Sequence, residues 1–306
     1  MTIRITQAMV SQRVLTDLQN VSNKLSQTQE KLSSGKELTK PSDDPFAVSK
    51  ALSLSNDLEG TQQFERTVTD ATGWANQTET ALSSINSAAQ RARTLLVQAG
   101  NDTNSTTDRS DIADEIDQLI ATIKGDANVQ YNGQFVLGGA STATAPYVVG
   151  GTPTDDTYHG DSAGVYRQIG PGVSVQINTL GSTVLGNGVA GDGGLISVLR
   201  GISQHLRSGT ATDADSLRTT DLSSLDASLD TISSTRAVNG ATTNRLSSAS
   251  DRLSQIEQST TSLLSNTQDA DMAKTMIDFS MQQTVYQSAL RAGANIVQAS
   301  LLDFLG

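Results

Sequence analysis

Residues 14–32, VLTDLQNVSNKLSQTQEKL, decide the fold, because their apolar side chains recur at alternating gaps of four and three, with Thr28 keeping the register. Residues 290–304, LRAGANIVQASLLDF, keep the same spacing near the other end of the chain. This spacing places one narrow apolar seam on each helix, the pattern by which helices pack against one another. The candidate assembly interface predicted from the two seams consists of Val14, Leu18, Val21, Leu25, Leu32, Leu290, Ala294, Val297, Leu301 and Phe304.

Neither seam is expected to form a stable helix by itself, since isolated helices of this length are marginal in water. Each end of the chain therefore needs a partner, either the other end or copies of both ends in neighbouring subunits. Residues 1–40 carry an excess of basic side chains and residues 267–306 an excess of acidic ones, which favours mutual pairing. From periodicity alone, an intramolecular coiled coil and a polymer-forming seam are equally good interpretations.

The composition narrows the chemistry open to the chain. It has 306 residues, which leaves room for two or three compact domains, and it has no cysteine, which excludes disulfides and thiol nucleophiles. Aromatic residues make up 4% of the chain, so cores must be built from Leu, Ile, Val and Ala. The net charge of −11 argues against nucleic acid as a partner.

The chain shows no sign of contact with a membrane. It has no run of about 20 apolar residues, the length that a spanning helix requires. Its first residues also lack the apolar segment and small-residue cleavage site of a secretory signal peptide. Taken alone, these features predict a cytoplasmic protein without a membrane partner.

A short loop separates the first helix from the second. The first helix is expected to end at Ser33-Ser34-Gly35, and Asp44 is a suitable N-cap for a helix that starts at Pro45. This capping role accounts for the neighbouring carboxylates Asp43 and Asp44 without catalysis. The residues of this helix-capping signature are Gly35, Pro41, Ser42, Asp43, Asp44 and Pro45.

Helical patterns continue beyond this loop and then give way to a different composition. The second helix should reach residue 99 with interruptions around Gly60 and Gly73, and a third helix follows. The Asn-Gly pair within residues 130–139 predicts a β-hairpin. Residues 141–194 are rich in Gly, Thr and short apolar runs, which predicts a small inserted β-rich domain.

The last long helix sets the predicted architecture. Residues 213–266 contain no proline and a single glycine, so this helix would be roughly 80 Å long. We expect a mainly α fold with an inserted β domain: an elongated rod of long antiparallel helices with a small β-rich domain at its tip. The predicted domains are residues 1–40 with 267–306 (terminal coiled-coil segments, disordered in the monomer), 41–140 with 195–266 (helical rod with a hairpin) and 141–194 (variable β-rich domain).

Several motifs invite a chemical interpretation, but a simpler one is favoured for each. Residues 186–191 match GxGxxG, yet the surrounding βαβ unit is missing, so a loop is predicted. Asp155 and Asp156, near His159 and Asp161, are interpreted as a solvated acidic loop rather than a metal site. His205 is expected to interact with the carboxyl end of its own helix.

No catalytic arrangement emerges from the sequence. The many serines have no base and orienting group in a recognisable pattern, so nucleophilic catalysis has no support. We predict no catalytic residues, no metal, no cofactor and no enzymatic activity.

Three segments together resemble the flagellin superfamily. Leu32–Lys36 followed by Pro41–Pro45 is similar to its N-terminal signature, residues 130–139 are similar to its short β element, and the tail from Ala289 to Leu305 resembles its C-terminus. The proline-flanked Asp-Asp and the Leu-Leu-Asp-Phe-Leu tail are more similar to the hook-associated junction members than to flagellins. The resemblance covers residues 1–140 and about 195–306, whereas 141–194 match nothing identifiable.

The resemblance implies a structural subunit at the junction between the hook and the filament of a bacterial flagellum. Its implied partners are copies of itself in a ring, the other hook-associated junction protein, the flagellin filament, an export chaperone that binds the C-terminal region, and the flagellar type III export apparatus. It thus implies a secreted, extracellular protein. The alternatives are a flagellin-type filament subunit and, from another class, a cytoplasmic binding module built on a long helical hairpin.

The physics of the seams then suggests a mechanism. The terminal helices would pair and pack against those of neighbouring subunits on assembly, burying apolar area at roughly 25 cal/mol per Å². The entropy cost of ordering the chain opposes this gain, so that assembly and folding are coupled.

Overall fold

The computed structural model of the chain describes residues 7–101, 104–150, 152–188 and 191–305, with only the backbone described from residue 295 onward. The chain divides into two compact units. The terminal unit comprises Met1–Gly60 and Ile256–Gly306, and the central unit comprises Thr61–Gln255.

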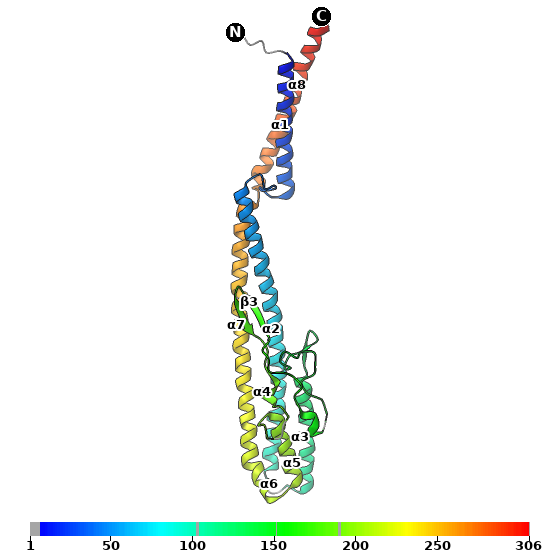
Figure 1. The fold of residues 1–306 in the computed structure, drawn as a ribbon, viewed down its shortest axis with the longest axis vertical. Coiled ribbons are helices and arrows are strands. Elements are labelled where there is room, and N and C mark those ends of the chain that lie inside the picture. Colours follow the sequence, from blue (N-terminus) through cyan, green and yellow to red (C-terminus); the bar gives the residue numbers. More distant parts are fainter. Residues whose placement is uncertain (1–6, 102–103, 151, 189–190, 306) are drawn as a thin grey trace. The chain divides into compact units, whose positions relative to one another are not determined.

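Helices dominate both units, and short strands lie in one inserted region of the central unit (Figure 1). The helices are α1 (Gln7–Ser34), α2 (Pro45–Ala99), α3 (Thr106–Ala127), α4 (Gly181–Leu185), α5 (Leu195–Ser208), α6 (Ala211–Ser216), α7 (Leu222–Gln268) and α8 (Met272–Leu305), with a 3-10 turn η1 (Pro153–Asp156) and a π turn η2 (Leu217–Asp221). The strands are β1 (Gln130–Tyr131), β2 (Gln134–Phe135), β3 (Tyr166–Gly170) and β4 (Val173–Gln176). The prediction of a mainly α chain with an inserted β region is confirmed.

Helix α2 is continuous, so the predicted interruptions at Gly60 and Gly73 are wrong. The two glycines lie in different surroundings. A Cβ added at Gly60 would meet nothing within 4 Å, whereas one at Gly73 would collide with the ring and hydroxyl of Tyr131. Gly73 is therefore a packing residue, and the missing side chain lets the Tyr131 ring approach the helix backbone.

The core of the central unit is built largely from aliphatic side chains of α2, α3, α5 and α7, together with the fully buried Trp74. On α7 apolar residues recur every seven positions in this core, and Leu225, Ile232, Leu246 and Leu253 are buried. Asn239 occupies the heptad position between Ile232 and Leu246, and its Nδ2 donates to the backbone oxygen of Ala75 at 3.0 Å. A buried polar residue at such a position fixes the register between two helices.

The predicted hairpin is present, but residues 141–194 form little sheet. β1 and β2 pair across Asn132 and Gly133, whose φ values of 49° and 77° are those of the tight turn that Asn-Gly favours. β3 and β4 form a second antiparallel pair. Tyr147 is buried and donates to the backbone oxygen of Gly186 at 2.6 Å, which ties two irregular stretches together.

The inserted region shares its core with the helices. Ile169, Val175 and Leu185 are buried in the same hydrophobic cluster as the helical residues of the central unit. The structure therefore groups residues 141–194 with their helical neighbours. The predicted boundary of a separate β-rich domain stays a prediction.

Candidate assembly interface

Helices α1 and α8 of the terminal unit lie side by side (Figure 1). Gly293 of α8 is buried, and a Cβ built there would lie 3.2 Å from Cγ1 of Val14 and 3.6 Å from Cδ1 of Leu18. Further along, Thr28 Oγ1 donates to Oε1 of Gln282 at 2.8 Å. The glycine lets the two backbones approach closely, and the buried polar contact fixes their register.

The segments that follow α1 and precede α8 pair as well. The backbone N–H of Glu37 donates to the oxygen of Gln268 at 2.7 Å, and that of Ala270 donates to the oxygen of Gly35 at 2.9 Å. Lys36 and Asp269 form an isolated antiparallel bridge between these contacts. Gly35 follows the last residue of α1 with a φ of 70°, as expected for the residue that ends a helix.

The structure brings the first seam to the α1–α8 contact but buries it only in part. The half-buried seam residues of α1 are Val14, Leu18, Val21, Leu25 and Leu32. On α8, Leu290 is 44% exposed and Ala294 is exposed. The remaining predicted positions, Val297, Leu301 and Phe304, lie outside the residues whose side chains are described, and the role of the whole set in assembly stays a prediction.

The terminal unit has almost no buried core in the single chain. Among the side chains that the structure describes in this unit, the hydrophobic residue that is buried is Ala51. The other buried residues there, apart from Gly293, are the three threonines Thr28, Thr260 and Thr275. The central unit, by contrast, buries dozens of apolar side chains, so only that unit has the core of a self-sufficient fold.

Helix α8 is apolar on faces that α1 does not cover. Gln282 and Gly293, which contact α1, lie on one side of the helix. At 3.6 residues per turn, the large exposed apolar side chains of α8 fall on two further flanks of the helix. One flank holds Met272, Met276 and Leu290, and the other holds Ile277, Met281 and Val285. Apolar surface on more than one side of a helix is normally covered by more than one partner, and α1 alone does not provide this.

Leu290 belongs to the predicted seam, whereas the other five flank residues were not predicted, because the seam follows only gaps of three and four. The signal was present in the sequence, since apolar residues between the seam positions widen the stripe beyond what one partner helix can cover.

A polar groove of about 380 Å³ runs beside the α1–α8 contact. Its lining includes Lys24 and Lys274 together with Asp269 and Asp278. Charges of both signs suit contact with another polar surface better than capture of an apolar ligand.

The signature loop caps α2 as predicted. Asp44 Oδ1 accepts the backbone N–H groups of Phe46 and Ala47, each at 3.0 Å, and Pro45 is the first residue of the helix. Pro41 and Ser42 are exposed in the preceding turn. These contacts explain why the helix begins where it does.

Asp43 organises the turn before the cap. Its Oδ2 accepts the backbone N–H of Lys40 at 2.9 Å and that of Thr39 at 3.1 Å. The hydrogen bond from the Lys40 backbone, helped by those from Thr39, lowers the pKa of the Asp43 carboxyl below its usual range. Lys40 Nζ also bonds Glu30 Oε2 at 2.9 Å, which links the loop to α1. Asp43 and Asp44 thus have separate structural tasks.

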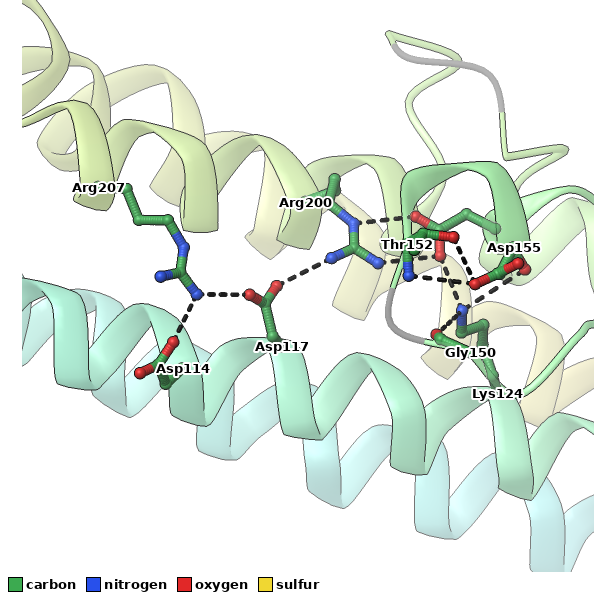
Figure 2. Close-up of polar contacts among 9 residues, drawn as sticks. Asp114, Asp117, Lys124, Gly150, Thr152, Asp155, Arg200 and Arg207 are labelled. Carbon is green, nitrogen blue, oxygen red and sulfur yellow. Dashed lines mark hydrogen bonds and ion pairs between the residues drawn. The ribbon is translucent and has the colours of Figure 1, made fainter.

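A network of charged side chains crosses the central unit between α3 and α5 (Figure 2). Lys124 is fully buried, and its Nζ lies 2.9 Å from Oδ1 of Asp156 and 2.6 Å from the backbone oxygen of Gly150. Arg200 also pairs with Asp156, at 2.9 Å from Nε to Oδ2. The prediction of a solvated acidic loop is therefore wrong for Asp156, since two cations offset the cost of burying its charge.

The network continues along the facing sides of α3 and α5. Arg200 Nη1 reaches Asp117 at 3.0 Å, and Arg207 Nη2 lies 2.6 Å from Asp114 and 2.7 Å from Asp117. Each charge of the network has a partner of opposite sign. The network thus holds α3, α5, Gly150 and the Pro153–Asp156 turn together.

The other motifs have structural roles in the described residues. Residues 186–188 and Gly191 lie in the loop between α4 and α5, as predicted, whereas 189 and 190 lie outside the described residues. Asp192 accepts the backbone N–H of Asn187 and of Gly194. His205 Nδ1 lies 2.7 Å from Oδ2 of Asp221, so its ring has a specific partner beyond its own helix. In the part of the chain that the structure describes, no cluster of His, Asp and Glu has the arrangement of a metal site.

In the described segments, no helix is both long enough and apolar enough to cross a membrane.

Two family models match most of the chain. The one described as the bacterial flagellin N-terminal helical region matches residues 5–142, and the one described as the bacterial flagellin C-terminal helical region matches residues 222–305. The first matched region includes α1, and the second includes α8. The stretch between them contains β3, β4 and the irregular segments of the central unit.

Similar proteins include both hook-associated proteins and flagellins. Flagellar hook-associated protein 3 of Escherichia coli (strain K12) is 28% identical over 292 residues, covering 90% of each chain. Flagellin of Bacillus subtilis (strain 168) is also 28% identical, over 99% of this chain and 100% of its own length. Among solved structures, the flagellar junction protein FlgL of Legionella pneumophila matches 71% of this chain and 100% of that chain with a TM-score of 0.57 at 15% identity, a likeness of fold.

Proposed function

Because this chain belongs to the bacterial flagellin family, we propose that it is the structural subunit that joins the hook of a flagellum to its filament. Its partners would be copies of itself, a second hook-associated protein and flagellin. The likeness to hook-associated protein 3 of Escherichia coli over 90% of both chains supports this position. The proline-flanked signature of residues 41–45 supports it as well.

The observation that carries the proposal is the contrast between the two units. The central unit has an extensive buried core, whereas the terminal unit leaves the α1 seam half-buried and two flanks of α8 uncovered. Covering apolar surface gains roughly 25 cal/mol per Å², and this gain becomes available when neighbouring subunits pack against α1 and α8. The terminal unit is thus suited to folding fully only within an assembly.

Export fits the same arrangement. A chain whose terminal helices lack a firm core is easily kept extended, which suits passage through the narrow flagellar type III apparatus. A small chaperone that covers the apolar flanks of α8 before export would prevent premature association. In this proposal the protein reaches the extracellular flagellum through that apparatus.

A filament subunit is the second candidate. The match to flagellin of Bacillus subtilis spans 99% of this chain and the whole of that one. A filament subunit would use the same terminal helices for assembly, so the geometry of α1 and α8 supports both candidates alike. The two differ in where the protein lies and how many copies each flagellum holds.

Deletion of the gene in the parent bacterium tests the proposal. We expect hooks without filaments, with motility restored by the wild-type gene. Immunogold labelling should then mark one narrow band at the base of the filament. Labelling along the filament would favour the filament subunit, and normal flagella in the deletion strain would overturn both.

A matched pair of variants ties the phenotype to α8. Ile277→Glu places a charge on an uncovered flank of α8, where Ile277 is 69% exposed, and should abolish filament attachment. Val238→Glu makes the same kind of change on α7 in the central unit, where Val238 is 65% exposed, and should complement the deletion. Equal complementation by both variants would show that the flank is not an interface.

A further inference from the structure

The sulfur of this chain is confined to the terminal unit. The sequence has no cysteine and five methionines, none of which falls between residues 61 and 255. The methionines with described side chains are all exposed: Met9, Met272, Met276 and Met281, at 54%, 48%, 63% and 57%. Buried cores commonly use methionine as a gap filler, so its restriction to exposed positions of one unit is informative.

Three of these methionines lie on the uncovered flanks of α8. Met272 and Met276 are one turn apart on the flank that also holds Leu290. Met281 lies on the other flank, between Ile277 and Val285. Met281 is thus set between two aliphatic side chains, and Met272 and Met276 lie beside each other, all on surface that the proposed assembly covers.

We propose that Met272, Met276 and Met281 form an oxidation-sensitive modification site, and that their conversion to methionine sulfoxide prevents the subunit from assembling. The inference rests on the proposed function, since assembly is the activity that it controls. The oxidant is a two-electron oxygen donor of the peroxide class. The thioether sulfur attacks one peroxide oxygen, the O–O bond breaks, and an S–O bond forms while water leaves, so that sulfur is oxidised and peroxide is reduced.

The surroundings make the modification costly for assembly. A sulfoxide is a polar acceptor, and burying one without a donor costs free energy. Ile277 and Val285, the neighbours of Met281, have no side-chain donor to offer it, and neither has the thioether that Met272 and Met276 present to each other. An oxidised flank would therefore stay in water rather than pack against a neighbouring subunit.

Few other groups compete for the oxidant. There is no thiol, and the single tryptophan, Trp74, is buried in the central unit. A mild peroxide treatment should therefore act on the terminal unit and leave the central core intact. Once assembled, the flanks are covered, so the sensitivity belongs to the free subunit.

The test uses the full-length purified chain and flagellar stumps from the deletion strain. The chain is treated with hydrogen peroxide, the sulfoxides are mapped by mass spectrometry, and the chain that co-sediments with the stumps is measured. Untreated chain should bind the stumps. Chain oxidised at all three positions should bind them at least about tenfold more weakly, the scale of one unpaired buried polar group. Methionine sulfoxide reductase should restore binding.

Two variants assign the effect to α8. In M272L/M276L/M281L the ratio of treated to untreated binding should stay near one, whatever binding the variant retains. Met9→Leu should remain as sensitive as the wild type. If the wild-type chain oxidised at all three methionines binds fully, the inference is overturned and the proposed function stands. If the untreated chain fails to bind, both are overturned.

Discussion

Lys124 Nζ lies 2.9 Å from Oδ1 of Asp156, and both side chains are almost completely buried in the central unit. The two residues are separated by an irregular stretch of chain, which their ion pair closes against α3. Arg200 adds a second cation to the same carboxylate. The pair therefore decides how residues 150–156 are attached to the helical core.

Asp156→Asn should destabilise the protein by about 3 kcal/mol, because two buried cations lose their counter-charge. Chemical unfolding followed by circular dichroism measures the loss on the central unit, which contributes most of the cooperative transition. The isosteric amide keeps the volume, so the effect isolates the charge.

Asp230→Asn is the control for this substitution. Asp230 is an exposed residue of α7, and neutralising it should change the free energy of unfolding by less than about 0.5 kcal/mol. Equal stability of the two variants would mean that the buried pair contributes nothing beyond an exposed carboxylate.

Gly60 and Gly73 make a second matched pair within α2. Alanine at Gly60 meets nothing within 4 Å and should stabilise the helix by about 1 kcal/mol, the difference in helix propensity. Alanine at Gly73 would collide with the Tyr131 ring and should instead destabilise by about 1–3 kcal/mol, as overpacking does. Thermal unfolding of the two variants should shift in opposite directions, and a stabilised Gly73→Ala protein would contradict the close packing of Tyr131.

These glycines also show where sequence reasoning stops. From composition alone, both glycines are expected to interrupt the helix. Only the position of Tyr131, which lies in a hairpin far along the chain, shows that Gly73 is required and that Gly60 is merely tolerated. By contrast, the Asn-Gly hairpin and the Asp44 cap were predicted correctly, because each depends on residues close in sequence.

The charged network was missed for the same reason. Lys124 follows Ile120 by one helical turn and thus stands on the buried stripe of α3, which signals a buried cation. Its partner Asp156 could not be identified, because the path of residues 141–155 follows no regular period. The acidic cluster was interpreted from its composition alone, and only tertiary structure shows that Asp156 is buried.

The turn held by Asp43 should depend on pH. The lowered pKa of Asp43 means that its ionised form is stabilised in the folded turn, so the contribution is present above the usual value of 3.8 and is lost as the pH falls through the lower folded value. Carbon NMR of the Asp carboxyl groups in the full chain should show a midpoint below 3.8 for the resonance that Asp43→Asn removes. A midpoint at or above 3.8 would contradict the hydrogen bonds from Lys40 and Thr39.

The weak core of the terminal unit predicts a distinctive pattern of limited proteolysis. Cleavage of the purified full chain should remove segments from residues 1–60 and 256–306 rapidly, leaving a resistant fragment close to residues 61–255. Mass spectrometry of the fragments gives the boundaries. Ends as resistant as the central fragment would show that α1 and α8 are stable without neighbours, and the coupling of folding to assembly would have to be withdrawn.

Substitution of Gly293 connects this pattern to the α1–α8 contact. A leucine there would extend into Val14 and Leu18 and separate the helices, so cleavage within α1 should accelerate several-fold, whereas Gly293→Ala should have a smaller effect because its Cβ lies 3.2 Å from Val14 Cγ1. Ala292→Leu adds the same side chain at an exposed neighbouring position and should leave the rate of cleavage in the free chain unchanged. If Gly293→Leu and Ala292→Leu are cleaved at the same rate, the helices do not pair in the isolated subunit, and their contact arises only between subunits.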